Sequence, residues 1–267
     1  MVSYGGGVQS TALLVLAAQR KLDITTFVHA NVGDDSENPA TVRYLREIAI
    51  PYAEAHGITI HIVQRVKRGG IPVTLLGELT APTNKAELIP VRLGTGMPAS
   101  RVCTSKFKIE VLAKWIKQQL GVSPSNPARV HLGISINEMQ RMRTQSGYNF
   151  YTVAYPLIDL RMNRNDCVRV IEMAGLPIPE KSACWFCPFT SLTKWSRMAD
   201  TNPDQFARAV QLERDINTHI RQPKGKDAIF FTDALRPLDV AVGSMSQGNL
   251  WQSTTEDATC DSGYCFL

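Results

Sequence analysis

The chain has 267 residues, of which 44% are hydrophobic and 20% charged, and its formal net charge is +5 at pH 7. This composition is enough for a substantial core, and the mild positive charge does not by itself indicate a nucleic-acid-binding protein. No run reaches the roughly 18 apolar residues of a membrane span, and Met1 to Ser3 leave no room for a signal peptide, so we expect a cytoplasmic protein with no membrane partner. The six cysteines are too few for a secreted disulfide scaffold, and their uneven grouping favours metal or redox chemistry.

A glycine-rich loop opens the chain. Ser3 and Tyr4 lead into Gly5, Gly6 and Gly7, and an apolar helical pattern follows directly. Three glycines remove the Cβ atoms that would keep backbone N–H groups away from an oxyanion, and Ser10 and Thr11 stand where a helix N-terminus adds donors. The loop therefore predicts a site for a phosphorylated small molecule. The alternative is an ordinary glycine-rich turn before a helix.

Strand-like and helical patterns alternate along most of the chain. We expect strands within residues 1–4, 24–30, 58–63 and 130–134, and helices within residues 40–55, 106–120, 164–173, 191–198 and 203–220. This alternation predicts an α/β fold with a Rossmann-like parallel sheet that binds ligands at the carboxyl ends of its strands. We place this domain at residues 1–176, and a smaller, mainly helical lobe with cysteines at residues 177–267. The loop at 67–101 is long enough to suggest a mobile segment that faces the substrate.

Two polar segments follow predicted strands. In the first, Gly33 allows a base or ribose to approach the backbone, while Asp34 and Asp35 suit ribose hydroxyls or Mg²⁺. Helix capping by Ser36 or Asp35 is the alternative for this segment.

The second polar segment begins at Gly133 and ends with two arginines, Arg141 and Arg143, whose guanidinium groups suit phosphate or sulfate oxygens. Glu138 stands one helical turn before Arg141. An ion pair on a solvated surface is the alternative for these two residues.

The cysteines form two groups. Cys103 lies beside Arg101, Lys106 and Lys108, which favour its thiolate, and Cys184 and Cys187 have the two-residue spacer of zinc and iron–sulfur sites. A structural zinc site made by Cys184, Cys187, Cys260 and Cys265 is the alternative to a functional centre. We expect Cys167 to be a small buried hydrophobic residue.

Taken together, these segments resemble the phosphoadenosine phosphosulfate reductase-like branch of the PP-loop ATP pyrophosphatase superfamily. Five further segments match the family in chain order after the glycine loop: the turn at Gly33, Cys103-Thr104 with Lys108, residues 133–141, residues 155–157 and residues 184–188. The resemblance implies a five-stranded adenine-nucleotide-binding fold of the HUP type. It also implies that ATP or a sulfonucleotide binds with Mg²⁺ at a set of residues: Ser3, Gly5, Gly6, Gly7, Gln9, Ser10, Thr11, Gly33, Asp34, Gly133 and Glu138.

In the iron–sulfur members of this family, a middle cysteine and a later pair hold a [4Fe–4S] cluster beside the nucleotide. The resemblance assigns Cys103, Cys184 and Cys187 to this role, with Cys265, Cys260 or an exogenous sulfur as the fourth ligand. It also implies that the chain adenylates a nucleic acid or a nucleotide and then transfers sulfur to it. Lys108 and Arg141 would stabilise charge at the α-phosphorus, and Cys265 is a further catalytic candidate. A cysteine desulfurase or a thioredoxin-like protein is the expected sulfur or electron donor.

Some residues depart from the family pattern. Gly5 and Gln9 replace a serine and an acidic residue of the usual loop, and the tail differs from the one that carries the nucleophile of the reductases. Two other functions therefore stay open. One is reduction of an adenylated sulfate, and the other is nucleotide binding without turnover by a subunit that holds structural zinc.

Overall fold

The computed structural model describes residues 1–143 and 146–246. Contacts divide the chain into two units. Within the described residues, the first comprises Met1–Pro72 and Thr104–Ala183, and the second comprises Val73–Cys103 and residues 184–246. This division assigns residues 73–103 to the same unit as the C-terminal part, whereas the boundary expected from the sequence lay at residue 176.

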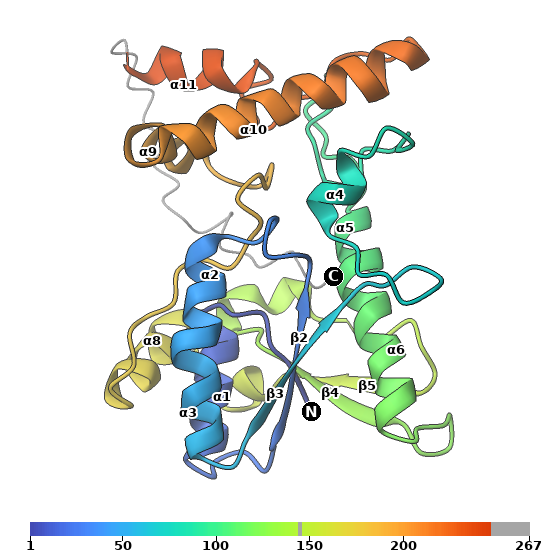
Figure 1. The fold of residues 1–267 in the computed structure, drawn as a ribbon. Helices are drawn as coiled ribbons and strands as arrows, with labels where there is room; N and C mark the ends of the chain where they lie inside the picture. The colour runs from blue at the N-terminus through green and yellow to red at the C-terminus, as the bar shows by residue number, and fades with distance from the viewer. Residues whose placement is uncertain (144–145, 247–267) are drawn as a thin grey trace. The chain divides into compact units, whose positions relative to one another are not determined.

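The first unit is built on a five-stranded, fully parallel sheet with the strand order β3-β2-β1-β4-β5, which confirms the predicted α/β Rossmann-like fold (Figure 1). The strands are β1 (Val2–Ser3), β2 (Thr26–Asn31), β3 (Thr59–Gln64), β4 (Ala128–Leu132) and β5 (Tyr151–Ala154). The chain order reverses between β1 and β4, which pair directly. In sheets of this kind, the crevice at the carboxyl ends of such a strand pair is where ligands bind.

Helices cover both faces of this sheet. Those of the first unit are α1 (Val8–Ala18), α2 (Pro39–Tyr44), α3 (Ile50–Ala55), α5 (Val102–Thr104), α6 (Glu110–Gln119), α7 (Pro156–Asp159) and α8 (Arg164–Met173), although α5 begins in the last residues assigned to the second unit. Figure 1 shows α6 on one side of the sheet and α1, α2 and α3 on the other. One core cluster joins α1, α3 and α8 to the sheet, and a second joins α6 to β2, β4 and β5.

From Ala12 to Ala17 the helix α1 is apolar and buried around its whole circumference, and Leu13, Leu14 and Val15 are fully buried. A helix of this kind must be covered on all sides, and α1 packs between the sheet and α8. Asn163 and Asp166 form a reciprocal capping box at the start of α8. Cys167 is fully buried in that helix, as expected from the sequence, and burial raises the pKa of its thiol to about 12.

Three helical stretches contain π-helical segments, at Leu45–Ala49, Ser105–Ile109 and Asn217–Arg221. Within the described residues, no helix is both long and apolar enough to cross a lipid bilayer.

The second unit contains α4 (Leu75–Leu79), α9 (Leu192–Thr201), α10 (Pro203–Ile216) and α11 (Leu238–Ser246). Backbone hydrogen bonds between Arg92 and Phe230 connect its two stretches of chain. The segment expected as one long loop at 67–101 therefore includes a short helix and ordered pairing. Glu213 of α10 is 3% exposed, and its carboxylate accepts hydrogen bonds from the backbone N–H groups of Phe231 (2.7 Å) and Leu238 (3.0 Å).

Burial raises the pKa of Glu213 to about 7 from the ordinary value of 4.5. Between these two pH values the folded state keeps a proton that the unfolded state releases, so this carboxyl stabilises the fold below pH 4.5 and loses its contribution as the pH rises through 7. We expect the free energy of unfolding to fall by up to roughly 3 kcal/mol over this window. In the Glu213→Gln variant that pH-dependent fall should disappear.

Urea titrations at several pH values measure this dependence. The matched control is Glu172→Gln, which removes an exposed carboxylate from the first unit. If Glu213→Gln and Glu172→Gln keep the same pH profile as the unchanged protein, the buried carboxyl does not have this role.

Candidate functional site

The glycine loop lies at the centre of the sheet, between β1 and α1. The strand ends at Ser3, and α1 begins at Val8 with Gly7 as its N-cap. Gly7 offers no capping side chain, and the first turn of α1 contains no acidic residue. The backbone N–H groups at this helix start are therefore left to other acceptors, and the helix dipole makes an anion the favoured one.

Two glycines allow three loops to meet at this helix start. Gly6 has a φ of +76°, and a Cβ at this position would lie 2.9 Å from Cγ2 of Thr41, at the start of α2. A Cβ at Gly133, directly after β4, would lie 2.9 Å from the backbone nitrogen of Ser10. The loops after β1, β2 and β4 thus contact one another with no room for a side chain at either glycine.

A segment far along the chain also reaches the glycine loop. The Ser182 hydroxyl donates a hydrogen bond to the carbonyl oxygen of Gly5, and the Asn38 N–H donates one to the carbonyl of Ala183 (3.0 Å). Ser182 was not predicted from the sequence, since its place beside the loop depends on a contact across 177 positions of sequence.

Three buried oxygen atoms around this crevice lack hydrogen-bond partners among the described residues. They belong to Glu37 and Thr41, which follow β2, and to Ser135, which follows β4. Glu37 and Thr41 are each 2% exposed, and Ser135 is fully buried. Buried polar atoms in folded proteins are nearly always satisfied, so these oxygens indicate a place where a ligand or water binds. None of the three was a candidate in the sequence analysis.

His29 on β2 is hydrogen-bonded to the backbone just before the glycine loop. It is 4% exposed, and its Nδ1 lies 3.0 Å from the carbonyl oxygen of Tyr4. Burial lowers the pKa of His29, and the charge of nearby Glu37 opposes this effect. The Tyr4 hydroxyl in turn pairs with the Thr11 hydroxyl (3.1 Å), so Thr11, a predicted phosphate ligand, has a structural partner.

The predicted residues Gln9, Glu138 and Arg141 form one buried chain of contacts. The Gln9 amide donates a hydrogen bond to Glu138 (3.3 Å), and Glu138 pairs with Arg141 at 2.8 Å. The two charged side chains are 8% and 4% exposed, respectively, so the alternative of a solvated surface pair is wrong. Gln9 thus connects the start of α1 to an ion pair on the loop after β4.

In the turn after β2, the alternative of helix capping by Ser36 or Asp35 is wrong. The N-cap of α2 is Asn38, whose side chain accepts a hydrogen bond from the Ala40 N–H, and neither Ser36 nor Asp35 caps the helix. Gly33 has a φ of +116°, and Asp34 forms an exposed ion pair with Arg46.

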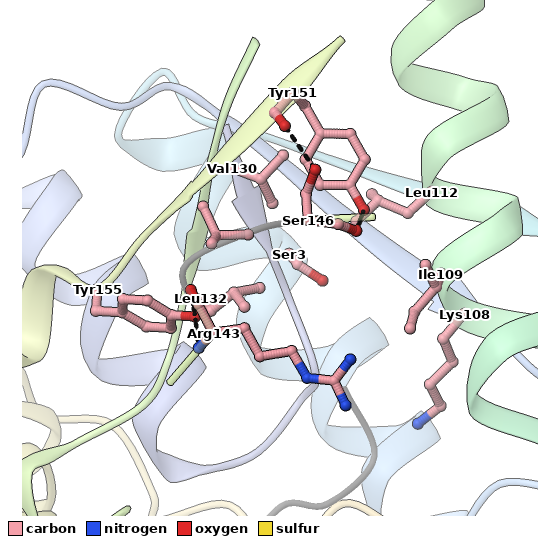
Figure 2. Close-up of a pocket in the computed structure, with 11 residues that line it drawn as sticks. Ser3, Lys108, Ile109, Leu112, Val130, Leu132, Arg143, Ser146, Tyr151 and Tyr155 are labelled. Carbon is pink, nitrogen blue, oxygen red and sulfur yellow. Dashed lines mark hydrogen bonds between the residues drawn. The ribbon is translucent and has the colours of Figure 1, made fainter. Parts of the chain in front are cut away.

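A pocket lies on the α6 side of the sheet, and Figure 2 shows the residues that line it. Its cavity volume is about 60 Å³, and its mouth is open to solvent. The predicted residues Ser3 and Lys108 both contribute to its lining, and Lys108 is 7% exposed. Arg143 also lines the pocket, although only Arg141 of the arginine pair had been assigned a catalytic role.

The described cysteines of the predicted cluster all belong to the second unit. Cys103, Cys184 and Cys187 are partly exposed and form no disulfide, and the Cys187 N–H donates to the carbonyl of Cys184 (3.1 Å). Over residues 1–143 and 146–246, no three histidine, cysteine or acidic side chains are grouped so that they could hold a metal ion. This geometry does not assemble a three-ligand cluster site, and the [4Fe–4S] cluster stays a prediction. Cys260 and Cys265, on which the zinc site and the reductase alternative depend, lie outside the described residues.

Comparison of the chain with family models, curated proteins and solved structures finds no match. The function therefore has to be argued from the site itself.

The close approach at Gly133 can be tested by adding a single methyl group. We expect Gly133→Ala to lower the free energy of unfolding by about 1–3 kcal/mol, because the new Cβ meets the backbone of α1 rather than a movable side chain. Gly94→Ala is the matched control, since a Cβ at Gly94 meets nothing within 4 Å. Urea denaturation measures both variants, and equal stability of the two would contradict the contact.

Proposed function

We propose that the first unit binds ATP at the glycine loop and transfers AMP to an acceptor with release of pyrophosphate. The observation that carries this proposal is the uncapped start of α1 at the sheet's reversal point, surrounded by the buried, unpartnered oxygens of Glu37, Thr41 and Ser135. Backbone N–H groups there suit the phosphates, and the oxygens suit the hydroxyl and amino groups of a nucleoside.

The charged residues nearby suit the chemistry at the α-phosphorus. Lys108 is a buried cation close enough to His29 to lower the pKa of that imidazole. A fixed cation stabilises the charge that develops on the phosphoryl oxygens during displacement. Arg141 can act in the same way, held in position by Glu138.

Magnesium is the expected companion of ATP. Mg²⁺ usually takes one or two protein carboxylates and completes its shell with phosphate oxygens and water, so it does not require a group of three protein ligands. Asp34, Asp35 and Glu37 are the carboxylates in the segment directly after β2. The Glu37 carboxylate, which has a buried oxygen without a partner, suits this role.

We further propose that the thiols of the second unit supply sulfur to the adenylated acceptor. Along the chain, Cys184 stands two positions after Ser182, the residue that donates a hydrogen bond to Gly5. This proximity in sequence supports a role for the pair Cys184 and Cys187 in the sulfur-transfer step. A nucleic acid or nucleotide as acceptor, a sulfur donor protein and a cytoplasmic location stay predictions of the sequence.

ATP binding tests the first part of the proposal. We expect Gly6→Ala to weaken ATP binding at least tenfold, about 1.4 kcal/mol, because a Cβ there would displace Thr41 and close the loop. Gly57→Ala is the matched control: Gly57 also has a positive φ (+70°), but its Cβ would meet nothing within 4 Å. Titration calorimetry with ATP and Mg²⁺ measures both variants. Absence of ATP binding to the unchanged protein would overturn the proposal.

Metal analysis of anaerobically purified protein tests the cluster that the resemblance implies. If the cluster is present, the protein should contain iron and absorb visible light, and Cys184→Ser should lose most of both signals because one thiolate ligand is removed. Cys167→Ser is a control, since Cys167 is buried in α8 of the first unit. Colourless, iron-lacking protein would contradict the cluster but not the nucleotide site.

A further inference from the structure

The pocket on the α6 side of the sheet is separate from the glycine loop, although it adjoins it. None of the residues 5–11 lines it, whereas Ser3, two positions before the loop, does. Its floor comes from two neighbouring strands, β4 through Val130 and Leu132 and β5 through Val153, and its wall on α6 includes Leu112. A ligand bound in it would therefore lie next to a nucleotide held by the loop.

The lining of this pocket combines aliphatic side chains with several polar groups. Aliphatic side chains and the ring of Tyr151 form its interior, and burial raises the pKa of the Tyr151 hydroxyl to about 12. Such a surface binds flat or branched hydrocarbon groups through the area they remove from water. The interior therefore suits the ring of a ligand.

Two cations stand at the other side of the pocket. Figure 2 shows the long side chains of Lys108 and Arg143 extending toward the same side of the space. The Arg143 backbone is fixed because its N–H donates to the Tyr155 hydroxyl (2.8 Å), which in turn donates to the Arg143 carbonyl (3.0 Å). Over the part of the chain that the structure describes, the Arg143 guanidinium makes no hydrogen bond or ion pair. Guanidinium and ammonium groups in this arrangement suit a planar carboxylate.

The described lining also contains no aspartate, glutamate or histidine. An alcohol, amine or thiol that attacks phosphorus must lose a proton, and a general base must be within hydrogen-bond reach to take it. A carboxylate is already ionised at neutral pH and needs no such base. The lining therefore favours a carboxylate as the attacking group.

We propose that this pocket binds a ring-bearing carboxylic acid, with its ring against Leu112, Val130 and Tyr151 and its carboxylate toward Lys108 and Arg143. This inference rests on the proposed ATP-dependent function and names its acceptor, which differs from the nucleic acid that the resemblance implies. A carboxylate oxygen attacks the α-phosphorus and forms the new P–O bond. The bond from this phosphorus to the α–β bridging oxygen breaks, and pyrophosphate leaves with the electron pair. The product is an acyl adenylate, and no electron or proton donor is needed.

Binding of simple acids tests the pocket without ATP. The probes are benzoate, cinnamate, indole-3-acetate and cyclohexanecarboxylate, with benzamide as the uncharged analogue of benzoate, and saturation-transfer NMR measures binding. We expect at least one acid to bind. If benzoate binds, benzamide should bind more weakly, because it lacks the negative charge. Arg143→Ala should weaken acid binding at least tenfold. Arg43→Ala is the matched control, because Arg43 is an exposed arginine on α2 of the same unit.

A larger side chain at Leu112, in the apolar part of the pocket, provides a second, independent test. Leu112→Phe should weaken acid binding while the affinity for ATP is kept. The proposal is overturned if no acid binds, or if acids bind equally well to the unchanged protein and to Arg143→Ala.

Acid-dependent pyrophosphate release, with hydroxylamine present to trap the acyl adenylate as a hydroxamate, separates the two proposals. If ATP binds and Gly6→Ala weakens its binding as expected, but no acid stimulates the release of pyrophosphate, the proposed acceptor is wrong and the proposed nucleotide site is kept. If acids bind with Arg143 dependence but ATP does not bind, the proposed ATP-dependent function fails. Release stimulated by a single-stranded oligonucleotide and by no acid would overturn the carboxylate acceptor in favour of a nucleic acid.

Discussion

The contact of Gly133 with the backbone of Gln9 and Ser10 is the constraint on which the candidate site depends. It brings the loop after β4 against the first turn of α1, so that the two central strands end in one crevice. Because this contact is between backbone atoms, it fixes the spacing of the loops more firmly than a side-chain contact, which rotates or is replaced. The Gln9 to Glu138 hydrogen bond and the buried Glu138–Arg141 pair depend on the same spacing.

Much of the fold could be predicted from local patterns. The parallel sheet was predicted from the apolar runs near β2, β3 and β4, since β-rich runs between helical patterns have few other arrangements. The loop before α1 was predicted from its glycines. The helix at Arg164–Met173 was predicted within its exact bounds. The shortest strands carry little pattern, and Tyr151–Ala154 was not singled out even though it completes the sheet.

The parts that escaped prediction depend on contacts distant in sequence. Ser182 lies beside Gly5 only because the chain returns after α8, and no local pattern signals this. Residues 67–101 were expected to be one loop, because the pairing of Arg92 with Phe230 joins segments more than a hundred residues apart and leaves no local pattern. Among the site residues, Glu37, Thr41 and Ser135 look like ordinary loop residues in sequence. Only their burial without a hydrogen-bond partner distinguishes them.

The π-helical segment Ser105–Ile109 makes the lining of the pocket sensitive to the length of a single helical turn. A π turn contains one residue more than an α turn, so it marks a place where a single residue can be gained or lost while the helix on either side continues. Loss of one residue here would rotate Phe107 and Lys108 by about 100° relative to α6, taking the cation away from the pocket and the ring out of the core. The length of this one turn therefore determines whether Lys108 lines the pocket.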